Sequence, residues 1–208
     1  MSKMGSQTEL IALLKAEGVL NNPAVIKAMK AVDRADFVLP RYRSLAYENY
    51  PLSIGFGQTI FQPYTVAFML ELLKVKKGEK ILEIGAGSGW QTAMLCQLVG
   101  KAGRVVAVER LSKLKRLEHI NLAKCHLYQN TITLIQGDGK LGYLAAAPYD
   151  KIIAAAAGSG IPEAWKQQLK IGGKIVAPVK HSIWEISKLS AKSFKIIRHW
   201  GFSFVPLV

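Results

Sequence analysis

The sequence is poor in cysteine and contains no long uninterrupted hydrophobic run. Its 208 residues include only Cys96 and Cys125, far fewer cysteines than a disulfide-stabilised scaffold contains. No apolar run approaches the roughly 20 residues that a membrane-spanning helix needs. The N-terminal residues also lack the pattern of a secretory leader. We therefore expect one domain, located in the cytoplasm, with reduced thiols and no membrane contact.

Acidic residues are scarce as well, with 14 against 28 lysines and arginines, which gives a formal net charge of +14. Such a charge suits nucleic acid, an acidic membrane or an anionic substrate, and charge alone does not choose among them. Because the lysines are scattered without interleaved aromatics or a zinc or RNP-type motif, a solvated surface is the favoured interpretation, ahead of substrate steering, and nucleic acid is the least favoured. The histidines have no cysteine or carboxylate at ligand spacing, so we predict no metal site.

Helical patterns dominate the N-terminal part of the chain. A helix is predicted over 8–18 with Thr8 as its cap, and a second begins at Asn22-Pro23, where proline suits the first turn. Residues 33–63 are too rich in aromatics, glycine and proline for a helix, so we predict an ordered loop, which at this length is usually functional. A further helix is expected from Pro63.

A regular alternation of strands and helices follows. The strands are near-continuous apolar runs, as in a parallel sheet that is buried on both faces. With right-handed crossovers these elements predict an α/β fold with a Rossmann-like, doubly wound, mostly parallel seven-stranded sheet under an N-terminal helical cover. Strands are expected at 80–85, 104–109, 131–136, 151–157 and 173–179, helices at 90–99, 112–128 and 162–169, and two edge strands within 184–208, joined near Lys192.

The sequence ILEIGAGSGW contains Gly85, Gly87 and Gly89 where a buried strand turns into a helix. Glycines at such a turn let the backbone approach a ligand at the helix N-terminus. Glu83, in the strand itself, is costly to bury without a cationic partner, and a ligand ammonium is one such partner. Glu109 ends the next strand, where a carboxylate can accept hydrogen bonds from ribose hydroxyls. A ligand-free glycine turn and a polar strand end remain the alternatives.

A dinucleotide site is the obvious rival, because it also uses an acidic residue on the second strand. Its fingerprint is G-x-G-x-x-G facing a pyrophosphate, whereas this chain has E-x-G-x-G-x-G. A carboxylate beside the turn repels pyrophosphate and attracts an ammonium, so a cationic sulfonium nucleoside fits better. Asp138, in QGDGK after the third strand, can accept from an adenine amino group, and a plain Asp-Gly turn is the alternative for it.

The chain from Asp36 to Val208 resembles the protein-L-isoaspartate (D-aspartate) O-methyltransferases, a family with the S-adenosylmethionine-dependent methyltransferase fold. The resemblance is carried by FVLPRYRSLAYEN, PLSIGFGQTIFQPYTVA, ILEIGAGSGWQTA, VER, GDG, APYDKII, QLKIGGKIVAPV and the closing FVPLV. It implies methyl transfer from S-adenosylmethionine to the carboxylate of isoaspartyl or D-aspartyl residues in damaged proteins, which leaves S-adenosylhomocysteine. The implied partners are peptides or unfolded segments that bear isoaspartyl residues, and we expect a monomer. The single domain would comprise helices and an active-site loop (1–62), a cofactor-binding core (63–180) and C-terminal strands (181–208).

The resemblance also implies the roles of individual residues. Thr59, Phe61 and Gln62 occupy the acceptor side of the implied active site. The implied cofactor contacts come from four places: Gln58, Thr59, Ile60 and Val66 on the loop; Glu83, Gly85, Ala86, Gly87, Ser88 and Gly89 at the methionine end; Glu109 and Arg110 at the ribose; and Gly137 and Asp138 at the adenine.

One departure from the family pattern affects the acceptor site, because Phe61 stands where the family usually has a serine. A carboxylate nucleophile is already ionised at neutral pH and needs no general base, so catalysis is mainly alignment. Thr59 and Gln62 remain to orient the acceptor, and we expect weakened activity rather than none. Two other readings stay open: a methyltransferase for a small molecule or RNA, and a cofactor-binding module without catalysis.

Overall fold

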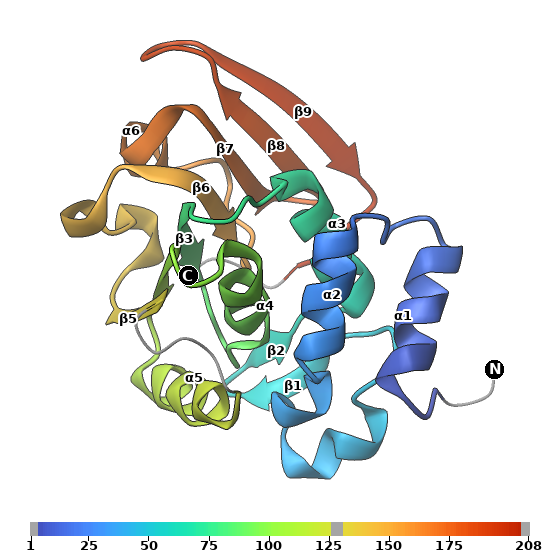
Figure 1. Ribbon diagram of the computed structural model, residues 1–208. Helices are drawn as coiled ribbons and strands as arrows, with labels where there is room; N and C mark the ends of the chain where they lie inside the picture. The colour runs from blue at the N-terminus through green and yellow to red at the C-terminus, as the bar shows by residue number, and fades with distance from the viewer. Residues whose placement is uncertain (1–3, 126–130, 205–208) are drawn as a thin grey trace.

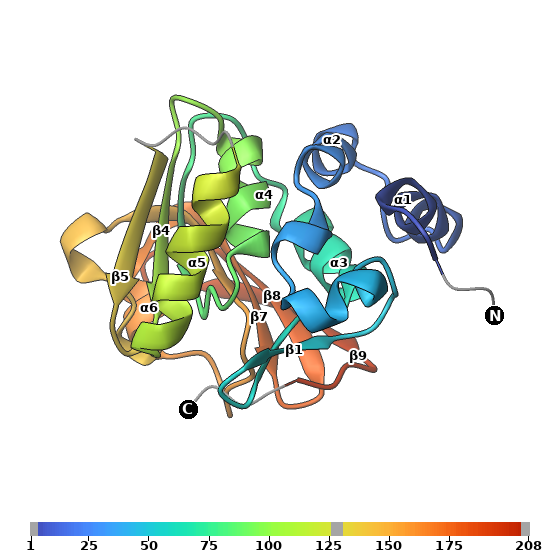
Figure 2. The ribbon, with the colours of Figure 1, turned by 90° about the horizontal axis from the view of Figure 1, so that it is seen from below.

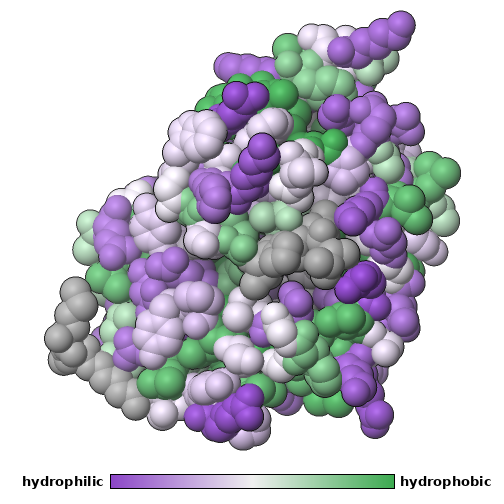
Figure 3. Space-filling view, turned by 180° about the vertical axis from the view of Figure 1, so that it is seen from behind, coloured by the Kyte–Doolittle hydropathy of each residue, from purple (hydrophilic) through white to green (hydrophobic). Residues whose placement is uncertain are grey.

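The computed structural model describes residues 4–125 and 131–204 (Figure 1). It contains a seven-stranded sheet with helices on both faces and a separate two-stranded hairpin. Among the described residues, no helix combines the length and the apolar character needed to span a bilayer. Hydrophilic side chains, with hydrophobic ones between them, are spread over the face seen from behind (Figure 3).

The elements follow one another along the chain with short connections. The helices are α1 (Gln7–Ala16), α2 (Pro23–Ala31), α3 (Pro63–Leu73), α4 (Trp90–Val99), α5 (Ser112–Lys124) and α6 (Glu163–Gln168), with 3-10 turns η1 (Arg34–Asp36), η2 (Pro40–Leu45), η4 (Gly139–Leu141) and η5 (Leu144–Ala146). The hairpin strands are β1 (Leu52–Gly55) and β2 (Gln58–Ile60), and the sheet strands are β3 (Lys80–Ile84), β4 (Arg104–Glu109), β5 (Ile132–Gln136), β6 (Tyr149–Ala154), β7 (Leu169–Val179), β8 (Ser182–Lys188) and β9 (Phe194–Trp200).

The sheet has the order β5-β4-β3-β6-β7-β8-β9, and its first five strands are parallel while β8 and β9 run antiparallel. This order confirms the predicted doubly wound, mostly parallel sheet with two strands closing one edge. The chain leaves β3 toward β4 on one side and returns to β6 on the other. That reversal is the point where sheets of this kind bind ligands, at the carboxyl ends of the strands.

Alternate residues of each strand enter two separate cores. Ile81 of β3 and Val105 of β4 pack with α1 to α5 in the larger core, while Leu82 and Val106 pack with α6 and the 3-10 turns on the opposite face. Both faces of these strands are therefore buried away from water, as their near-continuous apolar sequences predicted. Figure 2 shows α4 and α5 against the sheet, with α2 beside α4 and α1 further out, beyond α3.

The N-terminal helices begin at polar caps. Asn22 caps α2 through its side chain, and Pro23 is the first residue of that helix, as predicted. The cap predicted for α1 was wrong: Ser6, not Thr8, accepts the hydrogen bond from the Glu9 N–H. Ser6 has an extended backbone, with φ −150 and ψ 156, whereas Thr8 lies inside the helix. Extended geometry is what an N-cap requires.

The prediction of one loop over 33–63 was also wrong, because this segment forms two 3-10 turns and the β1–β2 hairpin. Its strands have three and four residues, too short for alternation to be visible in the sequence. Gly55, Phe56 and Gly57 all have positive φ at the hairpin tip, with Phe56 at 55°. Two flanking glycines make the left-handed turn accessible at low cost.

Smaller differences lie at the ends of elements. Helix α5 ends at Lys124 with Cys125 as its C-cap, and the rest of the predicted helix, up to residue 128, extends outside the described residues. Strand β6 begins and ends earlier than predicted, so the alanines at 155 and 156 leave the sheet. Strand β7 begins earlier than predicted, at Leu169. Its additional residues, among them Lys170 and Ile171, extend the strand at the exposed end of the sheet.

A partly buried lysine ties helix α3 to the antiparallel end of the sheet. Lys174 Nζ donates to the Leu72 carbonyl oxygen at 2.8 Å and forms an ion pair with Glu185. Leu72 belongs to the last turn of α3, where carbonyl groups lack partners within the helix. The ammonium group therefore satisfies an exposed carbonyl and the carboxylate at once, at the negative end of the helix dipole.

We expect Lys174→Met to lower the free energy of unfolding by about 2 to 3 kcal/mol, because it leaves Glu185 without its cation and Leu72 without its donor. Urea denaturation followed by tryptophan fluorescence measures this change. Lys170→Met is the control, since Lys170 pairs with Asp150 at a more exposed position and should cost less than about 1 kcal/mol. Equal losses in both variants would contradict this role for Lys174.

Candidate functional site

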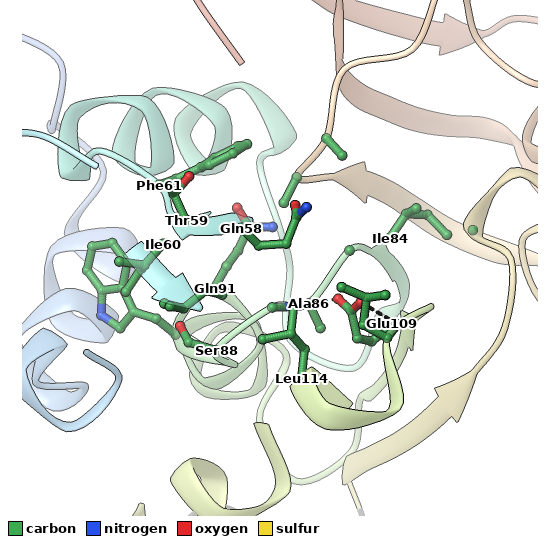
Figure 4. Close-up of a pocket in the computed structure, with 18 of the residues that line it drawn as sticks. Gln58, Thr59, Ile60, Phe61, Ile84, Ala86, Ser88, Gln91, Glu109 and Leu114 are labelled. Atoms are coloured by element: carbon green, nitrogen blue, oxygen red, sulfur yellow. Dashed lines mark hydrogen bonds between the residues drawn. The ribbon is translucent and has the colours of Figure 1, made fainter. Parts of the chain in front are cut away.

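A cleft opens at the carboxyl ends of β3 and β4, between the glycine-rich turn and the β1–β2 hairpin (Figure 4). It contains about 840 Å³ of space, part of which is open to solvent. Its lining is mostly apolar, with a few polar groups from the turn, the hairpin and the end of β4. The lining residues are Ile54, Gln58, Thr59, Ile60, Phe61, Val66, Ile84, Gly85, Ala86, Gly87, Ser88, Trp90, Gln91, Val108, Glu109, Arg110, Leu111, Leu114, Gly139, Ala155 and Ala156.

Most of the residues predicted from the sequence lie together in this cleft. Among the lining residues are the predicted Gln58, Thr59, Ile60, Phe61, Val66, Gly85, Ala86, Gly87, Ser88, Glu109 and Arg110. Figure 4 shows Gln58, Thr59 and Phe61 on the hairpin side, across from Ala86, Ser88 and Glu109. Five predicted residues are not among the lining residues, namely Gln62, Glu83, Gly89, Gly137 and Asp138.

The glycine turn brings the backbone close to the floor of the cleft. Gly85, Gly87 and Gly89 all have positive φ, at 77°, 59° and 89°. A Cβ at position 87 would lie 3.3 Å from Ile54 Cδ1, and one at position 89 would lie 3.0 Å from Glu118 Cγ. Side chains at these positions would therefore combine backbone strain with crowding, so glycine is needed for the close approach.

Glu109 links the end of β4 to this turn. Its Oε2 accepts a hydrogen bond from the Gly87 N–H at 3.0 Å, and its Oε1 accepts one from the Leu111 N–H at 2.9 Å. The residue is only 7% exposed, yet it lines the cleft. Because each carboxylate oxygen has two lone pairs, both oxygens can still accept a hydrogen bond from a ligand hydroxyl.

Glu83 lies behind the cleft lining, fully buried at 0% exposure. Its Oε1 accepts a hydrogen bond at 3.0 Å from Nε2 of Gln91, a lining residue. Glu118 of α5 is also fully buried and accepts from the Thr92 hydroxyl at 3.2 Å. Within the described part of the chain, Glu83 Oε2, Glu118 Oε2 and Gln91 Oε1 have no hydrogen-bond partner.

Burial controls the protonation of this carboxyl pair. Loss of hydration raises the pKa of Glu83 to about 7, although the neighbouring Thr92 hydroxyl and the hydrogen bond from Gln91 oppose the shift. Burial likewise raises the pKa of Glu118 well above its ordinary value, and the neighbouring Glu83 raises it further. Burial thus makes both carboxyls easier to protonate than an exposed glutamate.

The hairpin supplies the opposite wall, where Thr59 and Phe61 lie half-buried. Gln62 instead points away, because its Nε2 donates to the Asn49 carbonyl oxygen at 2.9 Å. The Asn49 side chain in turn accepts from the Tyr64 N–H at 3.0 Å, at the start of α3. Gln62 therefore ties the hairpin to its surroundings, and Thr59 provides the hydroxyl group on this wall.

Phe61 is one end of a row of aromatic rings. Its centroid lies 5.6 Å from that of Phe204, and Phe204 stacks on Phe202 at 5.9 Å. Phe202 contacts Phe68 of α3 at 5.2 Å, and Phe68 meets His199 edge-on at the same distance. The row joins the hairpin wall to α3 and the end of β9, so it gives this end of the cleft an apolar, well-supported side.

The segment after β5 contributes a different residue from those predicted. Asp138 is exposed, and its Oδ1 caps the following 3-10 turn by accepting from the Lys140 N–H at 2.9 Å. Gly139 lines the cleft instead, and its carbonyl oxygen accepts from the Trp165 indole N–H at 2.8 Å. A Cβ at 139 would lie 2.4 Å from Ile84 Cγ2, so glycine is required here.

Several lining residues were missed from the sequence. Trp90 and Gln91 begin the helix after the glycine turn, and their position at a helix N-terminus was an available signal. Leu111 and Leu114 open the helix after Glu109, where apolar residues suit either a core or a ligand. Ile54 had no signal, because the hairpin itself was not predicted.

Comparisons with known proteins identify the relatives of this chain. A family model described as protein-L-isoaspartate(D-aspartate) O-methyltransferase matches residues 5–208. A protein-L-isoaspartate O-methyltransferase of Ignicoccus hospitalis is 42% identical over 205 residues, covering 96% of this chain and 96% of that protein. An Archaeoglobus fulgidus protein-L-isoaspartate O-methyltransferase is 43% identical over 186 residues, covering 88% of this chain and 84% of its own. A crystal structure assigned to the same enzyme class, from Plasmodium falciparum in complex with S-adenosyl-L-homocysteine, shares the fold with a TM-score of 0.87 at 22% identity, covering 99% of each chain.

The raised pKa of Glu83 makes stability depend on pH in a defined direction. A carboxyl that is easier to protonate when folded stabilises the protein fully below its unfolded pKa, and this contribution is lost as pH rises through about 7. Between pH 5 and 8 we therefore expect the wild type to lose up to about 3 kcal/mol relative to Glu83→Gln.

Urea denaturation without ligand at both pH values measures this difference. Glu163→Gln is the control, because Glu163 is exposed on α6 beside Lys166 and should leave the pH dependence unchanged. Parallel curves for the wild type and Glu83→Gln would show that the buried carboxyl does not titrate in this range.

Proposed function

The chain belongs to the protein-L-isoaspartate(D-aspartate) O-methyltransferase family, and we propose that the cleft between the glycine turn and the β1–β2 hairpin is where it methylates isoaspartyl carboxylates. The family is one of S-adenosylmethionine-dependent methyltransferases, and so is this protein. One observation carries the proposal: Glu109 and the turn at 85–89 form one wall of a single cleft, and Thr59 and Phe61 form the other. Cofactor and acceptor therefore have facing walls.

The cofactor wall suits a sulfonium nucleoside in three respects. Glu109 keeps free lone pairs for ribose hydroxyls, and the close backbone at Gly85 and Gly87 leaves room for the methionine portion. Gln91 lines the cleft and contacts buried Glu83, so a ligand ammonium near Gln91 would favour the ionised form of that carboxyl.

Bound S-adenosylmethionine supplies a methyl group on a positively charged sulfur, which a carboxylate oxygen attacks to give a methyl ester and a neutral thioether. The reaction joins opposite charges, so its transition state is less polar than the separated reactants. Apolar residues around the reacting groups, including Ile60, Phe61 and Val66, exclude water from the pair. A dry site favours such a step, since neither reactant keeps its hydration shell.

The acceptor wall needs only to align the acceptor carboxylate with the methyl group. An isoaspartyl carboxylate is ionised at neutral pH, so no residue must remove a proton. The Thr59 hydroxyl is a side-chain group on the hairpin wall that can donate to this carboxylate, as the Gln58 amide is, and Phe61 limits the freedom of the acceptor sterically. Holding nucleophile and methyl in line at about 3 to 3.5 Å provides much of the rate enhancement in reactions of this kind.

The partner is proposed to be a peptide or an unfolded segment that carries the damaged residue. The cleft is open on one side, as access for a polymer requires, and the net charge of +14 attracts a substrate that presents a carboxylate. We also propose a monomer and a cytoplasmic location. Cys96 and Cys125 are both free thiols, which is consistent with a reducing compartment.

Methyl transfer from labelled S-adenosylmethionine tests the function directly. The acceptor is a short peptide with one isoaspartyl residue, and the control is the same peptide with ordinary aspartate. We expect label in the isoaspartyl peptide only, released again on mild alkaline treatment as a methyl ester would be. Cofactor binding without transfer to either peptide would mean that another acceptor is used.

A second prediction concerns Phe61. Replacing it with serine adds a hydroxyl donor at the acceptor wall, and one hydrogen bond to a charged group is worth about 1.5 to 3 kcal/mol. We expect Phe61→Ser to raise kcat/KM for the isoaspartyl peptide by about ten- to hundredfold. Phe61→Ala is the matched control, because it also breaks the contact with Phe204 but adds no donor.

If Phe61→Ala gains as much as Phe61→Ser, steric relief and not the hydroxyl explains the change. A fall in both variants would show that the aromatic wall contributes directly to acceptor binding.

A third prediction concerns the cofactor wall. Glu109→Gln removes one of the two acceptor oxygens that hold Gly87 and Leu111, and it places an NH₂ group against a backbone N–H. We expect the affinity for S-adenosylhomocysteine to fall by about ten- to hundredfold in calorimetry. Glu163→Gln, at an exposed position of α6 outside the cleft lining, should bind as the wild type does. Unchanged binding by Glu109→Gln would show that Glu109 does not contact the ligand.

A further inference from the structure

Arg34 is a buried arginine that holds the acceptor wall from behind. It begins η1 and is 0% exposed. Its guanidinium donates four hydrogen bonds to backbone carbonyl oxygens, all from segments that surround the hairpin. They run from Nη1 to Ala46 at 2.7 Å and Glu48 at 3.2 Å, and from Nη2 to Tyr50 at 3.1 Å and Phe61 at 3.0 Å.

The same guanidinium also contacts the cofactor wall. Its Cζ lies 5.3 Å from the ring centroid of Trp90, over the face of the indole. Trp90 is the first residue of α4, directly after the glycine turn, and lines the cleft as Phe61 does. One planar group therefore touches a residue of each wall, one through its backbone and the other through its ring.

This arrangement is costly, which argues against a purely space-filling role. No carboxylate within the described ranges forms an ion pair with Arg34, and burial lowers its pKa to about 9. A buried charge without a counter-ion is among the least favourable groups in a protein interior. Methionine could fill similar volume without this cost, but it could not bond to carbonyl groups on four residues.

The geometry of the bonds is specific to arginine. Each terminal nitrogen bridges two carbonyl oxygens, so the planar fork fixes the spacing among residues 46, 48, 50 and 61. A lysine ammonium retains the charge but has three donors on a single nitrogen, and it cannot span these four positions. The hairpin strand that ends at Ile60 is thereby held at one distance from Trp90.

We propose that Arg34 is a positioning residue, which sets the acceptor wall at Phe61 relative to the cofactor wall at Trp90 and so aligns the carboxylate with the methyl group. This inference rests on the proposed function of the cleft. Misplacement by about 1 Å can reduce the rate of a group transfer by about a hundredfold. This role requires the fork of hydrogen bonds. The positive charge matters only because it strengthens these bonds.

The prediction is a separation between turnover and cofactor binding. We expect Arg34→Lys and Arg34→Met to lower kcat for the isoaspartyl peptide by about a hundredfold. Affinity for S-adenosylhomocysteine should change less than about threefold in calorimetry, because the bonds of Glu109 to the turn do not involve Arg34. Rates are expressed per cofactor-binding site, so that any unfolded fraction affects numerator and denominator alike.

Chemical rescue separates positioning from a general loss of packing. Arg34→Ala leaves a cavity lined by the same carbonyl groups, and added guanidinium ion at millimolar concentration should restore part of the lost kcat in it. Methylammonium, which has the charge without the fork, should not. Arg43→Met is the control, because Arg43 lies on η2 with its side chain 70% exposed and should show wild-type kinetics.

Two results would overturn the proposal. One is a kcat within about threefold of wild type for Arg34→Lys, which would show that the fork is not needed. The other is a loss of cofactor affinity in proportion to turnover, which would make Arg34 a general structural residue. If the wild type itself transfers no methyl group, the proposed function fails instead, and the two failures are thus distinguishable.

Discussion

The cleft depends on the backbone of the glycine turn passing within hydrogen-bonding reach of Glu109. The bond from the Gly87 N–H to this carboxylate joins β3 to the end of β4 at the point where the strand order reverses. It requires positive φ at Gly85, Gly87 and Gly89, and it leaves no room for a side chain at 89 beside α5. The cofactor wall, the start of α4 and the depth of the cleft all follow from this one close approach.

Buried ionisable groups without counter-ions lie behind both walls of the cleft. Glu83 and Glu118 lie behind the cofactor wall, and Arg34 lies behind the acceptor wall. Elsewhere in the described chain, Lys174 has a carboxylate partner, whereas the buried Lys188 ammonium donates to two backbone carbonyl oxygens and forms no ion pair with a described residue. The groups behind the cleft differ from Lys188 in their place: the carboxyls suit a cationic ligand, and the guanidinium is proposed to set the geometry of the acceptor wall.

Phe61 stands where the resemblance to the family implies a serine, and the proposed reaction does not depend on that hydroxyl. The ring takes the place of a hydroxyl on the acceptor wall, yet it is supported by Phe204, Phe202 and Phe68, so the wall is well packed. Because a carboxylate acceptor needs no base, the loss of one donor affects the rate and not the type of chemistry. The neighbouring Thr59 and the bonds of Arg34 to the Phe61 carbonyl keep the backbone of this wall in place.

The sequence by itself determined the order and type of the sheet strands, the glycine turn, and the acidic residue that ends β4. These features depend on local signals, namely apolar runs, glycine spacing and strand length. The family, with its reaction and cofactor, was identified from matching motifs. Tertiary structure alone decided which side chains face the cleft. Glu83 lies behind the lining, Gln62 turns toward Asn49, and Gly139 replaces Asp138, because each orientation depends on partners distant in sequence. The hairpin and the bonds of Arg34 could not be predicted from the sequence either. The hairpin strands are too short to show periodicity. The hydrogen bonds of Arg34 form only once the chain has folded, because they join residues 34, 46, 48, 50 and 61.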